Sequence, residues 1–411
     1  MKKLVIVGAG AAGTMMAHHL NKSLDKDAWS ISVVDQHKTH YYQPGFLFVP
    51  FGRYTPEQTM KPKAGFIPKG VQFIQKAVDR IDVEKNELQL AEGETMPYDI
   101  LVIATGTRIV PDEVEGLAGD EWHKSAFDFY TIEGATALRD KLSTWEGGHL
   151  VIHIQEMPIK CPVAPLEFAF LADDFFRRRK MRDRVKMSYV TPLSGAFTKT
   201  TTSRVLGHTL ADKEIDLVPD FDTEAVEGRT LKSYGGQNID FDILVTTPTN
   251  MGDPMIERSG LGDDLNFIPT QNTLQSKVKE NVFVIGDATN LPASKAGSVA
   301  HFEAEVLTEN IERYIAGKPL ELEFDGHANC FIESGHGKAF LIDFNYAVDP
   351  TEGTFPFAGL GPFRLLKETG LNHLGKLAFK PMYWHLLLKG RPFPFATSKL
   401  SLKGKKLPQE A

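Results

Sequence analysis

Leu4-Val5-Ile6-Val7-Gly8-Ala9-Gly10-Ala11-Ala12-Gly13 is the most informative part of this sequence. Its four apolar residues predict a buried strand of a parallel sheet. The Gly-x-Gly-x-x-Gly pattern that follows allows a tight turn, and it lets the backbone approach a pyrophosphate at a helix N-terminus. We therefore expect a dinucleotide to bind at Gly8, Gly10 and Gly13.

Three further features have the positions that such a site requires. Residues 29–34 predict a second strand that ends at Asp35, whose carboxylate can accept hydrogen bonds from a ribose, although a solvated acid at a strand end is the alternative. Two later apolar strands end at Thr105-Gly106 and at Gly286-Asp287. Ligands of doubly wound sheets bind at such carboxyl ends of strands.

The glycine loop, Asp35, Thr105-Gly106 and Gly286-Asp287, in this order, resemble the flavoproteins with two dinucleotide-binding domains. The resemblance implies that all four features bind FAD. Some members attach FAD covalently to a cysteine in the loop that matches residues 36–45, where this chain has none. We therefore expect non-covalent FAD.

The predicted fold is α/β, with two Rossmann-like domains and a C-terminal region of different character. Residues 1–110 and 276–325 are expected to form the FAD-binding domain, and residues 111–275 the second domain. In the second domain, residues 155–167 contain no glycine where a nicotinamide dinucleotide would need a phosphate loop. Residues 326–411 form the C-terminal region.

The chain contains two cysteines, Cys161 and Cys330. Buried thiols acting as small apolar side chains are one interpretation. However, the segment Lys160–Glu167, together with the later Cys330, is similar to sulfide:quinone oxidoreductases and to the flavoprotein subunit of flavocytochrome c sulfide dehydrogenases. The resemblance implies a redox-active cysteine pair beside the flavin, which oxidises sulfide to sulfane sulfur or polysulfide.

Neighbouring residues refine this expectation. Lys160 is expected to lower the pKa of the Cys161 thiol. Glu167 is a candidate proton acceptor, with a carboxylate in the first turn of a helix as the alternative. Many sulfide:quinone oxidoreductases have a further cysteine where this chain has Tyr130, so we expect neither a three-cysteine mechanism nor flavin attachment there.

The net charge of −7 argues against general nucleic-acid binding, and no metal site is expected. No secretory signal and no membrane-spanning run is visible, so a cytoplasmic chain is expected. From Gly359 onward, however, the sequence contains eight lysines and two arginines but only two glutamates. This excess of positive charge suggests contact with an anionic surface.

The same tail is rich in apolar side chains, which predict two short amphipathic helices lying on a membrane surface, with Tyr383 and Trp384 at headgroup level. Packing on the body of the protein or on a second copy in a homo-oligomer is the alternative. In the resembling quinone reductases such a tail docks in the bilayer and aromatic rings line a quinone pocket. Phe357 and Phe363 are the predicted ring contacts, and Lys376 matches a family lysine near the flavin.

These features together predict an FAD-dependent sulfide:quinone oxidoreductase that is peripherally bound to the membrane. A type II NADH:quinone oxidoreductase is the enzyme alternative, disfavoured by the glycine-free loop. A non-catalytic flavin-containing or sulfur-binding subunit, which hands persulfide to a partner protein, is the alternative from a different class.

Overall fold

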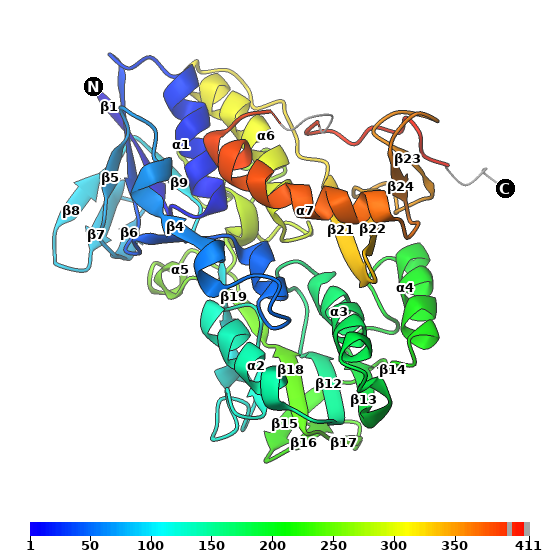
Figure 1. Cartoon of the computed structure of the whole chain (residues 1–411). Coiled ribbons are helices and arrows are strands. Elements are labelled where there is room, and N and C mark those ends of the chain that lie inside the picture. Colours follow the sequence, from blue (N-terminus) through cyan, green and yellow to red (C-terminus); the bar gives the residue numbers. More distant parts are fainter. Residues whose placement is uncertain (393–396, 407–411) are drawn as a thin grey trace.

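The computed structural model describes residues 1–392 and 397–406 of the 411-residue chain. Two five-stranded parallel sheets, one above the other in Figure 1, form its main body. A four-stranded sheet lies to the right of the upper one in the same view. The predicted α/β class with parallel sheets is confirmed.

The first sheet has the strand order β20-β9-β1-β2-β5, and every neighbouring pair is parallel. Its members are β1 (Lys2–Val7), β2 (Trp29–Val34), β5 (Gln72–Ile74), β9 (Ile100–Ile103) and β20 (Val282–Val284). The chain leaves this sheet after β9 and returns much later to add β20. Strands β9 and β20 are buried along their whole length, which explains their uninterrupted apolar sequences.

The intervening segment contributes the second sheet, with the order β11-β18-β12-β13-β14 and only parallel pairs. Its members are β11 (Ala126–Phe127), β12 (Gly148–Ile154), β13 (Val185–Val190), β14 (Asp216–Val218) and β18 (Ile243–Thr247). The boundaries of the four predicted domains stay predictions.

The third sheet has the order β21-β22-β24-β23. It comprises β21 (Ala328–Gly335), β22 (Lys338–Phe344), β23 (Gly353–Phe355) and β24 (Phe363–Leu365). Antiparallel pairing places Cys330 of β21 opposite Ile342 of β22. Smaller sheets contain β3 (Thr39–Tyr41) with β4 (Met60–Pro62), β6 (Val78–Asp82) with β7 (Glu87–Leu90) and β8 (Thr95–Pro97), β10 (Thr107–Val110) with β19 (Thr249–Gly252), and β15 (Thr223–Glu227) with β16 (Thr230–Ser233) and β17 (Asn238–Asp240).

Helix packing determines which distant segments meet. The α-helices are α1 (Ala11–Ser23), α2 (Ile132–Thr144), α3 (Ala164–Arg178), α4 (Thr200–Asp212), α5 (Pro254–Arg258), α6 (Gly297–Ile315) and α7 (Gly370–His385). Helix α3 packs against β21, and α7 packs against β21 and β22 (Figure 1). The short 3-10 helix η7 (Leu387–Lys389) packs against α1. The N-terminus of α3, the strand with Cys330 and helix α7 therefore lie together.

Within residues 1–392 and 397–406, no helix has both the length and the apolar character needed to cross a membrane.

Candidate active site

The glycine loop between β1 and α1 adopts the predicted tight turn. Gly8 has a φ of +99°, and a Cβ at this residue would lie 2.4 Å from the carbonyl oxygen of Ala104. A Cβ at Gly13 would lie 1.9 Å from the carbonyl oxygen of Gly8. Gly10, the N-cap of α1, instead has open space around its Cβ position. Two glycines are therefore required by packing, and the third leaves room beside the helix N-terminus.

Asp35 is hydrogen-bonded to this glycine loop. Its Oδ2 accepts a hydrogen bond of 2.7 Å from the backbone N–H of Ala9, and its Oδ1 accepts one from His37. The Lys63 ammonium forms an ion pair with Oδ2, and both side chains are largely buried. Asp35 is therefore not the freely solvated acid of the alternative interpretation. No feature of the sequence identified Lys63.

The two later turns converge on the same place, because β9 and β20 are neighbours in the sheet. Thr105 follows β9, and its buried Oγ1 has no hydrogen-bond partner among the described residues. Gly286 follows β20 with a φ of +71°, and its Cβ position lies 3.3 Å from the Cβ of Ala12 in α1. An open helix N-terminus, an unsatisfied buried hydroxyl and close-packed glycine turns fit a bound dinucleotide.

A buried acid that sequence reasoning missed supports the Gly286-Asp287 turn. The Oε2 of Glu303, from α6, accepts a 2.6 Å hydrogen bond from the Gly286 N–H. Burial raises the pKa of Glu303 to about 8. Burial also raises the pKa of Asp287, whereas the nearby Lys295 ammonium opposes that rise. The Lys295 Nζ donates to the carbonyl oxygens of Asp287 and Thr289 at 2.9 Å.

Cys161 and Cys330, far apart in the sequence, lie on segments that the packing of α3 on β21 brings together. Cys161 lies three residues before α3 with a φ of +46°, and its N–H donates to the carbonyl oxygen of Lys295 at 2.7 Å. Both thiols are free. Burial raises the pKa of both thiols, that of Cys330 to about 11, and the charge of Cys330 adds to the rise at Cys161. The two thiols therefore lie within range of each other's charge.

The prediction that Lys160 lowers the pKa of Cys161 is wrong. The Lys160 Nζ lies 3.4 Å from the carbonyl oxygen of Thr107, and burial dominates at the thiol. The lysine whose charge does favour both thiolates is Lys376 of α7. Sequence proximity suggested the wrong lysine, since the effective one comes from a distant helix.

Glu167 and Lys376 form a buried ion pair beside the cysteines. The Lys376 Nζ donates to the Glu167 Oε1 at 2.7 Å and to the carbonyl oxygen of Phe331 at 3.0 Å. The Glu167 Oε2 is buried and has no partner among the described residues. Burial raises the pKa of Glu167, and the positive charge of Lys376 opposes this rise. Burial alone would lower the pKa of Lys376, but the negative charge of Glu167 raises the pKa of this lysine. Glu167 does lie in the first turn of α3, but it is no solvated helix-end carboxylate.

The two predicted quinone contacts, Phe357 and Phe363, lie in different environments. Phe363 packs edge to face on Phe331, with ring centroids 5.4 Å apart, and Phe331 follows Cys330 directly in β21. The rings of both phenylalanines border the Cβ position of Gly375 in α7. Phe357 lies near the surface and is half exposed. Phe363 therefore packs on the residue that follows Cys330, and both quinone assignments stay predictions.

The glycine-free loop after β12 is held by side-chain hydrogen bonds to Thr249 and Asn250 of β19. The Gln155 Nε2 donates to the Thr249 Oγ1 at 2.8 Å, and the backbone N–H of Lys160 donates to the Asn250 Oδ1 at 3.1 Å. Helix α3 then begins with a proline in its first turn and has no side-chain cap. This loop lacks the glycine turn seen at Gly8.

Helix α7 differs from the prediction for the tail. It is one helix followed by η7, and Tyr383 and Trp384 are buried rather than at headgroup level. The Tyr383 hydroxyl lies 2.7 Å from the Nε2 of His40, and Trp384 stacks on Phe66. Aromatic partners from the first domain cover these rings, which is why they do not face solvent.

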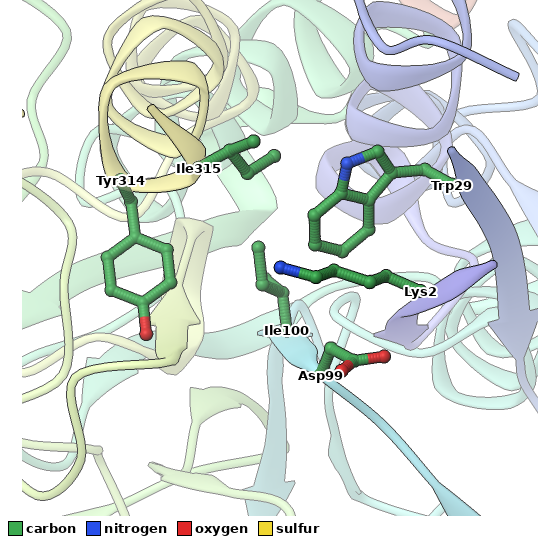
Figure 2. Close-up of a pocket in the computed structure, with 6 residues that line it drawn as sticks. All are labelled: Lys2, Trp29, Asp99, Ile100, Tyr314 and Ile315. Carbon is green, nitrogen blue, oxygen red and sulfur yellow. The ribbon is translucent and has the colours of Figure 1, made fainter. Parts of the chain in front are cut away.

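A surface hollow of about 360 Å³ lies elsewhere, at the amino ends of β1, β2 and β9 (Figure 2). It is lined by Lys2, Trp29, Asp99, Ile100, Tyr314 and Ile315. Parallel sheets bind their ligands at the carboxyl ends of the strands. This hollow is therefore at the opposite edge from the glycine loop.

Known proteins resemble this chain in both sequence and fold. The model of the pyridine nucleotide-disulphide oxidoreductase family matches residues 2–154. The mitochondrial sulfide:quinone oxidoreductase of Dictyostelium discoideum is 27% identical, over 95% of this chain and 87% of the relative. That of Mus musculus is 25% identical, over 94% of this chain and 86% of the relative.

Among solved structures, the sulfide:quinone oxidoreductase from Aquifex aeolicus superimposes with a TM-score of 0.81 at 20% identity. The alignment covers 95% of this chain and 92% of that one, so the whole fold is shared. The chain is therefore similar over nearly its whole length to sulfide:quinone oxidoreductases, and its first 154 residues include a match to the pyridine nucleotide-disulphide oxidoreductase family.

Proposed function

We propose that this protein is an FAD-dependent sulfide:quinone oxidoreductase whose cysteine pair, Cys161 and Cys330, takes two electrons from sulfide. The observation that carries the proposal is that these two thiols, 169 residues apart in the chain, lie within range of each other's charge and of the buried Glu167–Lys376 pair. Once oxidised to a disulfide, such a pair with an adjacent acid and cation would provide both a sulfur electrophile and a proton acceptor.

The residues at the carboxyl ends of β1, β2, β9 and β20 would hold FAD. Gly10 and the N-terminus of α1 offer N–H donors and positive potential to a pyrophosphate. Asp35 lies where a ribose is bound in such sheets, and Thr105 has an unsatisfied hydroxyl. None of the binding residues is a cysteine, so the cofactor is held without a covalent bond.

The proposed reaction starts from the oxidised cysteine pair. Hydrosulfide attacks one sulfur of the Cys161–Cys330 disulfide, the S–S bond breaks, and a persulfide forms on one cysteine and a thiolate on the other. The persulfide proton passes to Glu167. Joining the two sulfur anions through a trisulfide bridge releases two electrons, for which bound FAD would supply the acceptor on the way to quinone. A further sulfide or another thiol then removes the sulfane sulfur.

Helix α7 supplies the surface for the membrane partner. Leu371, Leu374 and Leu377 are exposed on successive turns, although the helix packs on the protein through other residues. Leucines at this spacing form an apolar stripe that can enter the headgroup region, and the cationic tail adds attraction to anionic lipid. We therefore place quinone exchange at the membrane face of the protein.

A type II NADH:quinone oxidoreductase is disfavoured, because the loop at residues 155–163 offers no glycine turn for a second dinucleotide. The test is anaerobic, steady-state reduction of a short-chain ubiquinone by the FAD-loaded protein, with sulfide or NADH as donor. Rapid reduction with sulfide and none with NADH is expected. Reduction by NADH alone would reverse the assignment. Sulfide binding as persulfide without quinone reduction would favour a non-catalytic sulfur carrier.

A further inference from the structure

Two buried carboxylates lie next to each other where α3 meets β21. The backbone N–H of Glu333 donates to the Glu167 Oε1 at 2.8 Å, so the strand itself connects the two residues. Both side chains are fully or almost fully buried. Glu167 is paired with Lys376, whereas the Glu333 carboxylate contacts a histidine.

This histidine, His373, has a partly exposed imidazole. The Nδ1 of His373 lies 2.8 and 3.0 Å from the two carboxylate oxygens of Glu333. The His373 side chain is 18% exposed, compared with 0% for Glu333. His373 and Lys376 are three residues apart in α7, so one face of this helix presents both residues to the acids.

The remaining charged and titratable groups around Glu333 can be named. The Arg53 Nη1 lies 3.7 Å from Glu333, while the Arg53 Nη2 is bound to Asp174 at 2.7 Å. Burial raises the pKa of the half-buried Tyr54, the positive charge of Lys376 opposes this rise, and the negative charge of Glu333 adds to it. Arginine keeps its proton at all relevant pH values, and tyrosine loses its own only in alkali. Histidine is the residue type whose ordinary titration lies near neutrality.

The proposed sulfur chemistry requires such a group. Each turnover releases a proton beside Glu167, and Glu167 cannot pass it directly to solvent because the residue is buried. The Lys376 ammonium is held by two acceptors and is also nearly buried. Among the groups named here, the pair Glu333–His373 connects this buried site to the protein surface.

We propose that His373, acting through Glu333, is the positioning residue that balances the charge of the Glu167–Lys376 pair by exchanging its own proton with solvent. The inference deepens the proposed function and rests on it. A proton taken up by Glu167 increases the positive charge of the cluster, and the loss of a proton from His373 to water restores the starting charge. Glu333 transmits the change, because it contacts Glu167 through its backbone and His373 through its carboxylate.

The test follows sulfide-driven flavin reduction by stopped-flow absorbance between pH 5.5 and 8.5. The FAD-loaded parent is compared with His373→Gln, Glu333→Gln and the control His385→Gln, an exposed histidine of the same helix. Thermal stability and flavin content of each variant are measured alongside. We expect a reduction rate about tenfold lower, with a flattened pH profile, in the first two variants and no change in the control.

A second experiment separates proton exchange from structural support. In His373→Ala, added imidazole is expected to restore the rate. An unchanged pH profile in His373→Gln, or a slow His373→Ala that imidazole does not restore, would overturn the inference. If the parent itself is not reduced by sulfide, the proposed function fails instead, so the two failures are distinguishable.

Discussion

At the scale of single residues, the glycine loop was predictable from the sequence because each glycine follows from local backbone geometry. The partners of Asp35 and Glu167 were not, since Lys63 and Lys376 reach them only through tertiary packing. Lys376 lies 209 residues after Glu167 in the chain. Side-chain pairing over such separations leaves no periodic or spacing signal. The same reason explains why Glu303, Glu333 and His373 were missed.

Substitution of two loop glycines should have different effects. A Cβ at Gly13 would overlap the Gly8 carbonyl oxygen, so Gly13→Ala should distort the loop and destabilise the apoprotein. Gly10→Ala has room in the protein, so the apoprotein should remain as stable as the parent while its affinity for FAD falls about tenfold or more. Thermal unfolding of the apoproteins and fluorescence titration with FAD provide the two readouts. Equal FAD affinity in Gly10→Ala and the parent would contradict the placement of the cofactor.

The raised pKa of Glu303 predicts how stability changes with pH. Between its ordinary pKa near 4.5 and its folded value of about 8, the folded protein holds a proton that the unfolded chain loses. This group's contribution to the free energy of unfolding is therefore complete below that window and is lost as the pH rises through it. Glu303→Gln keeps an oxygen for the Gly286 N–H and should flatten the fall in melting temperature between pH 6 and 8. An unchanged slope would refute the assignment.

At the scale of elements, the sequence predicted the strands that end at ligand-binding turns, because buried parallel strands are read directly from apolar runs. The C-terminal helix was harder to predict. Tyr383 and Trp384 have the composition of membrane-interface residues, but they pack on His40 and Phe66 from a distant part of the chain. An amphipathic pattern shows that one face is apolar and does not show what covers that face.

Helix α7 should therefore bind membranes through its leucines. Replacing Leu371, Leu374 and Leu377 together by serine removes the exposed apolar stripe, with little effect on packing because all three are exposed. Flotation with vesicles of anionic and neutral phospholipid should show at least about a tenfold loss of binding. Tyr234→Ser, which removes an exposed ring outside this region, is the matched control. Undiminished flotation of the triple variant would exclude α7 as the membrane contact.

The ion pair between Glu167 and Lys376 links α7 to α3 and should contribute to stability. Lys376→Met leaves a buried carboxylate without its cation, which costs about 3–5 kcal/mol in comparable sites. Adding Glu167→Gln to this variant should recover part of the loss, because the uncompensated charge is removed. Urea unfolding of both variants measures the difference. Equal stability of the single variant and the parent would mean that the pair is not buried in solution.

At the scale of the whole molecule, the sequence predicted two Rossmann-like domains, and the fold has the two parallel sheets that such domains require. The sequence could not show that the segment with Cys330 folds into a separate sheet against α3. That contact depends on how three units separated in the chain pack together. It is also the contact that turns two isolated cysteines into a candidate pair.

If sulfide delivers its electrons to this pair, reduction of the flavin depends on both cysteines. The decisive measurement is anaerobic stopped-flow absorbance of the FAD-loaded protein mixed with sulfide, with Cys161→Ser and Cys330→Ser as paired variants. We expect flavin bleaching in the parent and none in either variant, while all three proteins bind FAD. Bleaching that persists in both serine variants, or a parent whose flavin stays oxidised in sulfide, would contradict the account.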